Sequence, residues 1–264
     1  MKIAIIGYGK MGHAIERIAL ERGHEIVAVI DAGNTADIDG EAFASADAAI
    51  EFTTPSTAPA NIVRATLAGV PVVCGSTGWG ADREKVENEV RNAGGALLAS
   101  SNFSIGVNVF NIISRRLASI MAHIPSYRPT MTEVHHVHKL DHPSGTALTL
   151  AEGIMAEDHE ITSWSDAGIV WANATPEERQ AQLDAAAKAL DNVPNNTLPI
   201  LSLRKDEVPG IHTIKWDSPV DMITIEHSAK SRDGFALGAV MAAEWIQGRK
   251  GIFTIDQMME ELMK

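Results

Sequence analysis

The chain has 264 residues, with 22 Lys or Arg against 34 Asp or Glu, which gives a formal charge of −12 when the histidines are neutral. A nucleic acid duplex or an anionic membrane requires a basic surface, and neither this balance nor any clustered run of Lys and Arg provides one. The composition, 45% hydrophobic and 21% charged, is that of a globular protein with a sizeable core, which excludes disordered and fibrous classes. We therefore expect a small-molecule partner, with no nucleic acid and no membrane.

The single cysteine, Cys74, cannot form an intramolecular disulfide, as is typical of proteins from a reducing compartment. The amino terminus has too short an apolar stretch for a signal peptide, and no run approaches the roughly 18 apolar residues of a membrane span. The sequence therefore predicts a cytoplasmic protein.

The first hundred residues alternate short apolar runs with helix-length amphipathic stretches, as in a parallel sheet covered by crossover helices. We predict strands at 2–6, 25–30, 48–52, 70–73 and 96–99. The intervening helices are predicted at 11–21, 57–68 and 82–92. This part of the chain is expected to form a doubly wound α/β domain.

A second set of elements follows, in which strands and helices no longer alternate regularly, so we expect a mixed sheet. The predicted elements are a helix at 105–121, a strand at 130–139, a helix from Gly145, a helix at 176–190, strands at 198–203, 211–216 and 221–228, and helices at 234–247 and 255–263. The last two helices are expected to return to the first domain. The domains are accordingly 1–106 with 233–264, and 107–232.

Gly7-Tyr8-Gly9-Lys10-Met11-Gly12 follows the first predicted strand and opens a helix, which is the context of a dinucleotide-binding loop. Gly7 permits the tight turn, Gly9 lets the backbone approach a pyrophosphate, and Gly12 allows close packing of helix on strand. Asp31 ends the second strand, where a carboxylate accepts hydrogen bonds from the adenosine ribose. The alternative is a structural glycine turn with an incidental Asp.

Asp31 also favours NADH over NADPH, because its charge repels a 2′-phosphate and residues 32–36 contain no Lys or Arg to bind one. NADPH remains a possible second cofactor. Two further loops at strand ends, Thr53-Thr54-Pro55 and Gly75-Ser76-Thr77-Gly78, are predicted to line the nicotinamide side, unless they are ordinary turns.

The segment from Glu133 to Thr146 concentrates groups that exchange protons. On a regular strand, one face presents Glu133, His135, Val137 and Lys139. These side chains include a carboxylate, an imidazole and an ammonium group. Ser144-Gly145-Thr146 then begins a helix, whose free N–H groups can bind an anion.

Three interpretations of this segment compete. It is a polar strand followed by an N-capped helix, or a zinc site drawing on His136, His138 and either Glu133 or His142, or an active site. No thiolate ligand and no helical H-E-x-x-H motif is present, so we expect no metal. We favour the active site, in which Lys139 and a histidine move protons while Ser144-Gly145-Thr146 hold an acidic substrate.

The segment 133–147 resembles the E-x-H-H-x-x-K-x-D-x-P-S-G-T-A signature of the 4-hydroxy-tetrahydrodipicolinate reductases of lysine and diaminopimelate biosynthesis. Matches elsewhere support this resemblance across nearly the whole chain, in the family's order: 7–12, 75–78, 101–108, 202–204, 210–212 and 230–232. The resemblance implies a Rossmann-type domain, a second α+β domain with a mixed sheet, and a homotetramer.

The resemblance also assigns residues. His135 matches the family's proton donor and acceptor, Lys139 matches its proton donor, and His136, Gly145 and Thr146 match substrate contacts. The residues that match loops near the nicotinamide are Gly75, Ser76, Thr77, Ser100, Ser101, Asn102 and Phe103. The implied reaction is the NAD(P)H-dependent reduction of a dicarboxylate, 4-hydroxy-tetrahydrodipicolinate, to tetrahydrodipicolinate with loss of water.

The chain departs from the family pattern in two places. Its glycine loop is shorter, with Lys10 in place of an arginine, and an Ala/Glu/Gln-rich stretch at 172–196 replaces a Gly/Arg-rich one. We expect this stretch to form a packing helix. Two rival functions remain open, another two-domain NAD-dependent dehydrogenase and a non-catalytic dinucleotide-sensing protein.

Overall fold

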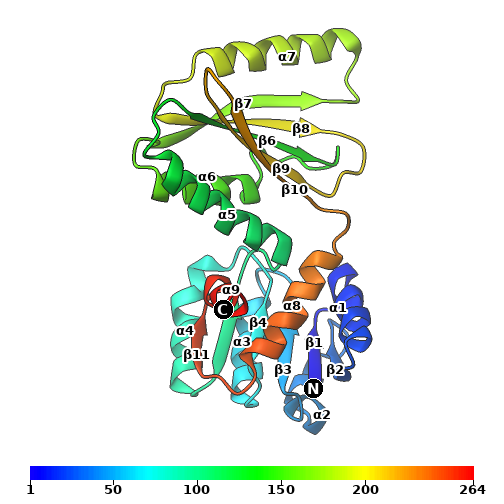
Figure 1. Ribbon diagram of the computed structural model, residues 1–264. Coiled ribbons are helices and arrows are strands. Elements are labelled where there is room, and N and C mark those ends of the chain that lie inside the picture. The colour runs from blue at the N-terminus through cyan, green and yellow to red at the C-terminus, as the bar shows by residue number, and fades with distance from the viewer. The chain divides into compact units, whose positions relative to one another are not determined.

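The computed structural model describes all 264 residues, and the chain divides into two compact units. The N-terminal unit comprises Met1–Asn108 and Arg232–Lys264, and the central unit comprises Val109–Ser231. The chain thus leaves the N-terminal unit through the first turn of helix α5 and returns to it at helix α8 (Figure 1).

The N-terminal unit contains a six-stranded parallel sheet in the order β11-β5-β4-β3-β1-β2. Its strands are β1 (Lys2–Ile6), β2 (Glu25–Ile30), β3 (Ala48–Glu51), β4 (Val72–Cys74), β5 (Ala96–Ala99) and β11 (Gly251–Phe253). Short apolar runs form these strands because both faces of a parallel sheet are covered, and β3 and β4 are buried along their whole length. The expected doubly wound sheet is confirmed, whereas β11, three residues long, was not predicted.

Helices cover both faces of this sheet. They are α1 (Lys10–Glu21), α2 (Glu41–Ala44), α3 (Ala58–Leu67), α4 (Arg83–Asn92), α8 (Asp233–Ile246) and α9 (Ile255–Leu262). Helices α3 and α4 pack on one face, and α1 and α8 contact each other on the opposite face. The winding direction reverses between β1 and β3, so ligands are expected at the carboxyl ends of these two strands.

The central unit contains a five-stranded mixed sheet in the order β10-β9-β6-β8-β7, in which β6 runs parallel to β8 and antiparallel to β9. Its strands are β6 (Arg128–His135), β7 (Ser163–Trp171), β8 (Thr197–Arg204), β9 (Ile211–Asp217) and β10 (Met222–Ser228). The expected mixed sheet is confirmed. Strand β7 was not predicted, because its burial does not alternate regularly and its register shifts between Asp166 and Ile169.

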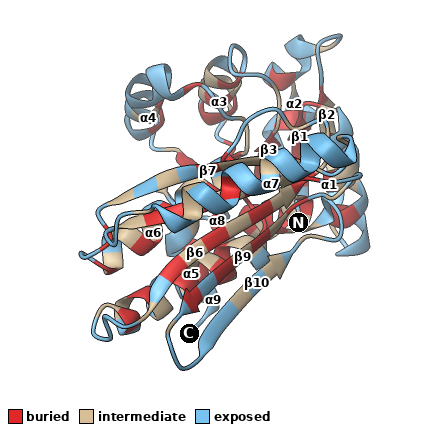
Figure 2. Ribbon diagram, turned by 90° about the horizontal axis from the view of Figure 1, so that it is seen from above, coloured by how far each residue is buried: buried red, intermediate tan, exposed pale blue.

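One face of the mixed sheet is buried beneath α5 (Ile105–Met121) and α6 (Gly145–Glu157), with which it shares a hydrophobic core. The other face is half-exposed. Helix α7 (Pro176–Asp191) contacts edge strand β7 and is mostly exposed, with only Ala186 buried (Figure 2). This is the helix expected within the Ala-rich stretch.

Strand β6 ends at His135, four residues before the predicted end. The chain then turns: the Val137 N–H donates to the carbonyl of Asp206, and the Lys139 N–H donates to the carbonyl of His136. The strand alternation therefore places Glu133 and His135 on one face, but the prediction that Lys139 continues this face is wrong. Lys139 belongs to the loop between β6 and α6.

None of the helices combines the length and the apolar character that crossing a lipid bilayer requires.

Candidate active site

A pocket of about 270 Å³, here called the Asp31 pocket, lies at the carboxyl ends of β1, β2 and β3. Its wall is formed by residues 6–9, 30–32, 35, 52–54, 57 and 61. Gly7, Tyr8 and Gly9 line it together with Asp31, as the dinucleotide prediction requires. No protein group pairs with the Asp31 carboxylate, and no Lys or Arg lines the pocket. Thr53 and Thr54, expected on the nicotinamide side, line this pocket instead.

The three glycines of the loop have different surroundings. A Cβ on Gly7 would lie 2.1 Å from the carbonyl oxygen of Phe52, and a Cβ on Gly12 would lie 2.3 Å from that of Gly7. Gly9, in contrast, has no other atom within 4 Å of its added Cβ, so its bare backbone borders open space. Helix α1 begins directly after Gly9 without a side-chain cap, which leaves N–H groups for phosphate oxygens. These features fit a nicotinamide dinucleotide.

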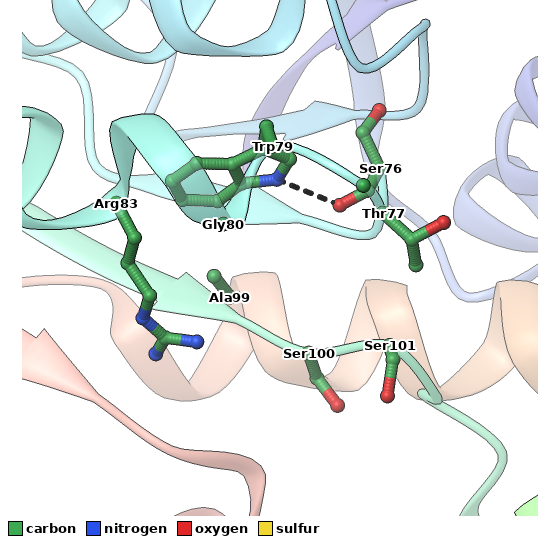
Figure 3. A pocket seen from close by; sticks show the side chains of 9 residues that line it. Ser76, Thr77, Trp79, Gly80, Arg83, Ala99, Ser100 and Ser101 are labelled. Atoms are coloured by element: carbon green, nitrogen blue, oxygen red, sulfur yellow. Dashed lines mark hydrogen bonds between the residues drawn. The ribbon is translucent and has the colours of Figure 1, made fainter. Parts of the chain in front are cut away.

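A second pocket of about 220 Å³, the Ser76 pocket, lies where β4 and β5 end. Figure 3 shows Ser76 and Thr77 on one side and Ser100 and Ser101 on the other. The indole N–H of Trp79 donates to the carbonyl of Ser76 at 2.8 Å and secures this loop. Trp79, Gly80 and Arg83 also line the pocket, and the sequence analysis had not selected them.

The remaining residues predicted to bind the cofactor do not line either pocket. Gly75 leaves room for the Phe52 ring, which would lie 2.1 Å from an added Cβ. Phe103 is buried with its ring centroid 6.1 Å from that of Phe52, and Asn102 accepts a hydrogen bond from the Ser104 N–H. Lys10 and Met11 begin helix α1.

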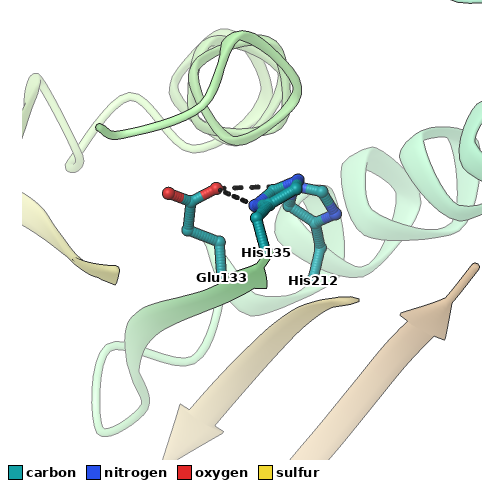
Figure 4. A group of neighbouring side chains, drawn as sticks. All are labelled: Glu133, His135 and His212. Atoms are coloured by element: carbon teal, nitrogen blue, oxygen red, sulfur yellow. Dashed lines mark ion pairs between the residues drawn. The ribbon is translucent and has the colours of Figure 1, made fainter. Parts of the chain in front are cut away.

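In the central unit, Glu133 and His135 of β6 and His212 of β9 lie together on the buried face of the mixed sheet (Figure 4). The His135 Nδ1 atom is 2.9 Å from Glu133 Oε2. The imidazole rings of His135 and His212 are in edge-to-face contact, with centroids 5.2 Å apart. Ser144, the N-cap of α6, lies 3.2 Å from His212 Nε2. The polar end of the sheet thus meets the start of the substrate-binding helix predicted from sequence.

Buried Arg204 of β8 completes this cluster. Its Nη2 atom is 3.1 Å from Glu133 Oε1, to which the Ser202 hydroxyl also donates at 2.8 Å. The guanidinium further donates to the backbone carbonyls of Lys139, at 2.9 Å, and Asp141, at 2.7 Å. One buried cation therefore contacts both the Glu133 carboxylate and the loop that carries Lys139.

The protonation states follow from these contacts. Burial acts to raise the pKa of Glu133, but hydrogen bonds with His135, Ser144 and Ser202 outweigh it and hold the pKa well below its usual range. Burial, which outweighs the opposing effect of the Glu133 carboxylate, lowers the pKa of His212 to about 3. Glu133 is thus ionised and His212 neutral at physiological pH.

Lys139 is partly exposed and forms an ion pair with Asp141, with Nζ–O distances of 2.8 and 2.7 Å. Burial would raise the pKa of Asp141, yet the ammonium group of Lys139 lowers it overall. Gly145 at the start of α6 is exposed and has open space around its Cα. Lys139 and the start of α6 are thus the groups after β6 that could bind an anion.

Two of the other histidines of the segment, His138 and His142, pair with separate carboxylates. Half-buried His136 lies with its ring 5.9 Å from that of His138, while exposed His138 pairs with Glu207 at 2.8 Å and His142 with Asp166 at 2.9 Å. The zinc alternative built on His136 and His138 has no structural support. Ligand atoms of Glu133, His135 and His212 do lie within 4.8 Å of one another, but Arg204 already neutralises the carboxylate.

Arg204 and His212 were missed as site residues. The sequence analysis had grouped them only as family matches at 202–204 and 210–212. Alternation along their strands signals that both side chains face the core, yet a buried Arg or His at such a position is unusual unless it is paired. A core-facing Arg or His on a strand was therefore the signal that could have identified both residues.

Comparisons with known proteins agree on one family. The family model described as dihydrodipicolinate reductase, N-terminus, matches residues 1–103, and the model described as dihydrodipicolinate reductase, C-terminus, matches residues 106–259. The chain belongs to the dihydrodipicolinate reductase family. Members of this family are oxidoreductases that use a nicotinamide dinucleotide.

Individual relatives span the full length of the chain. The 4-hydroxy-tetrahydrodipicolinate reductase of Christiangramia forsetii is 38% identical over 100% of both chains, and that of Archaeoglobus fulgidus is 30% identical over 98% of this chain and 100% of its own. A dipicolinate-bound dihydrodipicolinate reductase from Paenisporosarcina sp. TG-14 superimposes with a TM-score of 0.70 at 21% identity, covering 96% of this chain and 97% of that one. This last likeness shows the shared fold of the reductases.

Proposed function

We propose that this chain reduces 4-hydroxy-tetrahydrodipicolinate to tetrahydrodipicolinate, with loss of water, using NADH. The observation that carries the proposal is the arrangement at the end of β6. There His135, Lys139 and the start of α6 combine proton-transfer groups with an anion-binding helix terminus. This combination suits a dicarboxylate substrate that must gain a proton as it is reduced.

The roles divide between the two units. The glycine loop and Asp31 would hold the pyrophosphate and the adenosine ribose, and the Ser76 pocket would take the nicotinamide. When bound, the dinucleotide supplies the hydride. In the central unit, the N–H groups at Gly145 and Thr146 would bind a substrate carboxylate, with His136 as a further contact, while Lys139 or His135 supplies the proton.

The preference for NADH rests on the Asp31 pocket. An unpaired carboxylate at the ribose position accepts hydrogen bonds from two hydroxyls but repels a 2′-phosphate. No Lys or Arg lines the pocket to offset that repulsion. NADPH is expected to serve as a poorer second cofactor.

We also propose a cytoplasmic homotetramer. The half-exposed face of the mixed sheet, which carries Thr130, Thr132 and Val134 on β6, is the surface best suited to subunit contacts. Cys74 is buried and unpaired, which supports a reducing compartment.

The test is a coupled assay, in which dihydrodipicolinate synthase generates the unstable substrate from pyruvate and aspartate semialdehyde while NADH absorbance is followed. We expect NADH oxidation that depends on both the synthase and this protein. If NADH binds but is not consumed while the synthase is demonstrably active, the protein is a different dehydrogenase or a dinucleotide sensor.

A further inference from the structure

The two oxygens of the Glu133 carboxylate have different partners. Oε1 accepts hydrogen bonds from the Ser202 hydroxyl at 2.8 Å and from Arg204 Nη2 at 3.1 Å. Oε2 lies 2.9 Å from His135 Nδ1, an ion-pair contact, and neither of these two buried atoms makes a hydrogen bond of regular geometry to any other group. The carboxylate therefore faces donors on one side and an imidazole nitrogen on the other.

An ionised carboxylate can only accept hydrogen bonds, so a proton must lie on Nδ1 for this contact to be favourable. The depressed pKa of Glu133 keeps the carboxylate ionised. The second ring nitrogen of His135, Nε2, faces the bare backbone of Gly210, where an added Cβ would lie 3.1 Å away. With the proton on Nδ1, Nε2 carries the lone pair that can take up and release a proton.

We propose that Glu133 is a positioning residue, held by Arg204 and Ser202, which fixes His135 in the tautomer protonated on Nδ1 and leaves Nε2 to exchange protons with substrate. The same guanidinium holds the Lys139 loop through two backbone carbonyls, so it orients both proton-transfer groups. The catalytic role of the Glu133–His135 pair rests on the proposed function, whereas the assignment of the His135 tautomer does not depend on it.

The other charged and titratable groups around His135 are compatible with this assignment. His212, on the adjacent strand β9, is neutral, and its Nε2 atom is 4.0 Å from Glu133 Oε2, too far to replace His135 as the partner of that oxygen. Arg204 of β8 contacts the opposite carboxylate oxygen. In the loop after β6, Lys139 is paired with Asp141.

The substitution Glu133→Gln tests the proposal with little change in shape. Because Arg204 and Ser202 both donate toward Oε1, the amide oxygen of the new side chain is held there and its NH₂ group faces Nδ1. An NH₂ group donates a hydrogen bond, so Nδ1 becomes the acceptor and the proton moves to Nε2. The variant is thus expected to carry His135 in the opposite tautomer.

The direct measurement is ¹⁵N–¹H NMR of the histidine rings, at a pH where the His135 ring is neutral. The wild-type protein should show His135 protonated on Nδ1, and Glu133→Gln should show it protonated on Nε2. The matched control is Glu207→Gln, which alters an exposed carboxylate–histidine pair at His138 and should leave the His135 signals unchanged. A wild-type His135 protonated on Nε2 overturns the proposal, whether or not any variant folds.

The kinetic measurement uses the coupled assay. Glu133→Gln should lower kcat on the order of 10²-fold and leave the KM for NADH unchanged, as second-layer partners of catalytic histidines do. Its pH profile should also change, because the substitution replaces an acceptor of the His135 ring proton by a donor. A normal kcat and pH profile in a variant with the altered tautomer overturns the catalytic part of the proposal.

A second variant separates positioning from charge. Arg204→Lys keeps the buried positive charge but loses the planar guanidinium that contacts Glu133 and both loop carbonyls. This variant should have a lower kcat and unchanged NADH binding. If wild-type protein shows the expected tautomer but does not consume NADH, the proposed function fails while the Glu133–His135 assignment stands.

Discussion

Lys139 lies in the loop between β6 and α6 and is the proposed proton donor. Replacing it by Ala removes this proposed proton donor and its positive charge. We expect Lys139→Ala to lower kcat on the order of 10²-fold or more, with NADH affinity near wild type. Lys188, exposed on α7, provides the control, since Lys188→Ala should be fully active. Normal turnover by Lys139→Ala would remove Lys139 from the mechanism.

The proposed preference for NADH rests on the Asp31 carboxylate, which lines a pocket without Lys or Arg. The variant Asp31→Ala should bind NADH more weakly and discriminate less against NADPH, because both the hydrogen bonds to the ribose and the repulsion of a 2′-phosphate are lost. The measurement is kcat/KM for both cofactors. Asp39→Ala is the control, because Asp39 pairs with Arg64 and does not line the pocket. Unchanged affinity for both cofactors would show that the ribose lies elsewhere.

His212 makes the stability of the protein depend on pH. Its pKa is about 3 in the folded protein, below the ordinary value of 6.5, so the unfolded chain binds a proton that the folded chain rejects between these values. Stability should therefore fall as the pH drops below 6.5, and this residue contributes on the order of 2 kcal/mol of that loss between pH 7 and pH 5.

The check is urea unfolding of wild type and His212→Gln at both pH values. The variant should lose less stability on acidification, by roughly the contribution of the missing imidazole. Other titrating groups are common to both proteins and cancel in the difference. If the free energies of unfolding of wild type and His212→Gln fall in parallel with pH, His212 titrates normally in the folded protein.

At the scale of elements, two glycines of the loop between β1 and α1 have different roles: Gly12 allows close packing, and Gly9 leaves room for the cofactor. Gly12→Ala should destabilise the protein by about 1–3 kcal/mol, because its Cβ would overlap the carbonyl of Gly7 and move α1 away from the strand. Gly9→Ala meets no atom and should keep its melting temperature, but its methyl group enters the space for the pyrophosphate. We expect Gly9→Ala to bind NADH at least roughly tenfold more weakly than the wild type.

Thermal unfolding and NADH titration of the two variants check this prediction. A Gly9→Ala protein that binds NADH normally would place the pyrophosphate away from the start of α1. A fully stable Gly12→Ala protein would contradict the packing role of that glycine.

At the scale of the whole molecule, the half-exposed face of the mixed sheet is the expected site of assembly. Four chains of 28.3 kDa correspond to a particle of about 113 kDa, which light scattering after size exclusion can detect. Thr132→Lys, in the middle of central strand β6, should reduce this mass by placing a charge in the interface. Gln180→Lys on exposed α7 is the control. A monomeric wild type would contradict the prediction of a homotetramer.

Much of the fold could be predicted from local patterns. Apolar runs bounded by turn residues located five strands of the parallel sheet, because a strand covered on both faces must be apolar throughout. Short or irregular elements escaped prediction. Strand β11 has three residues, and β7 contains a register shift near Gly168 that breaks the period of two.

The sequence by itself determined the chemistry of the candidate site: the glycine loop, the acid that follows β2, and the His135–Thr146 segment are each contiguous or set by one supersecondary unit. Only the tertiary structure decided which groups meet Glu133. Arg204, 71 residues further along the chain, and His212 reach it because β8 and β9 flank β6. Alternation indicates which face a residue occupies, but strand order depends on how a whole sheet buries its apolar surface.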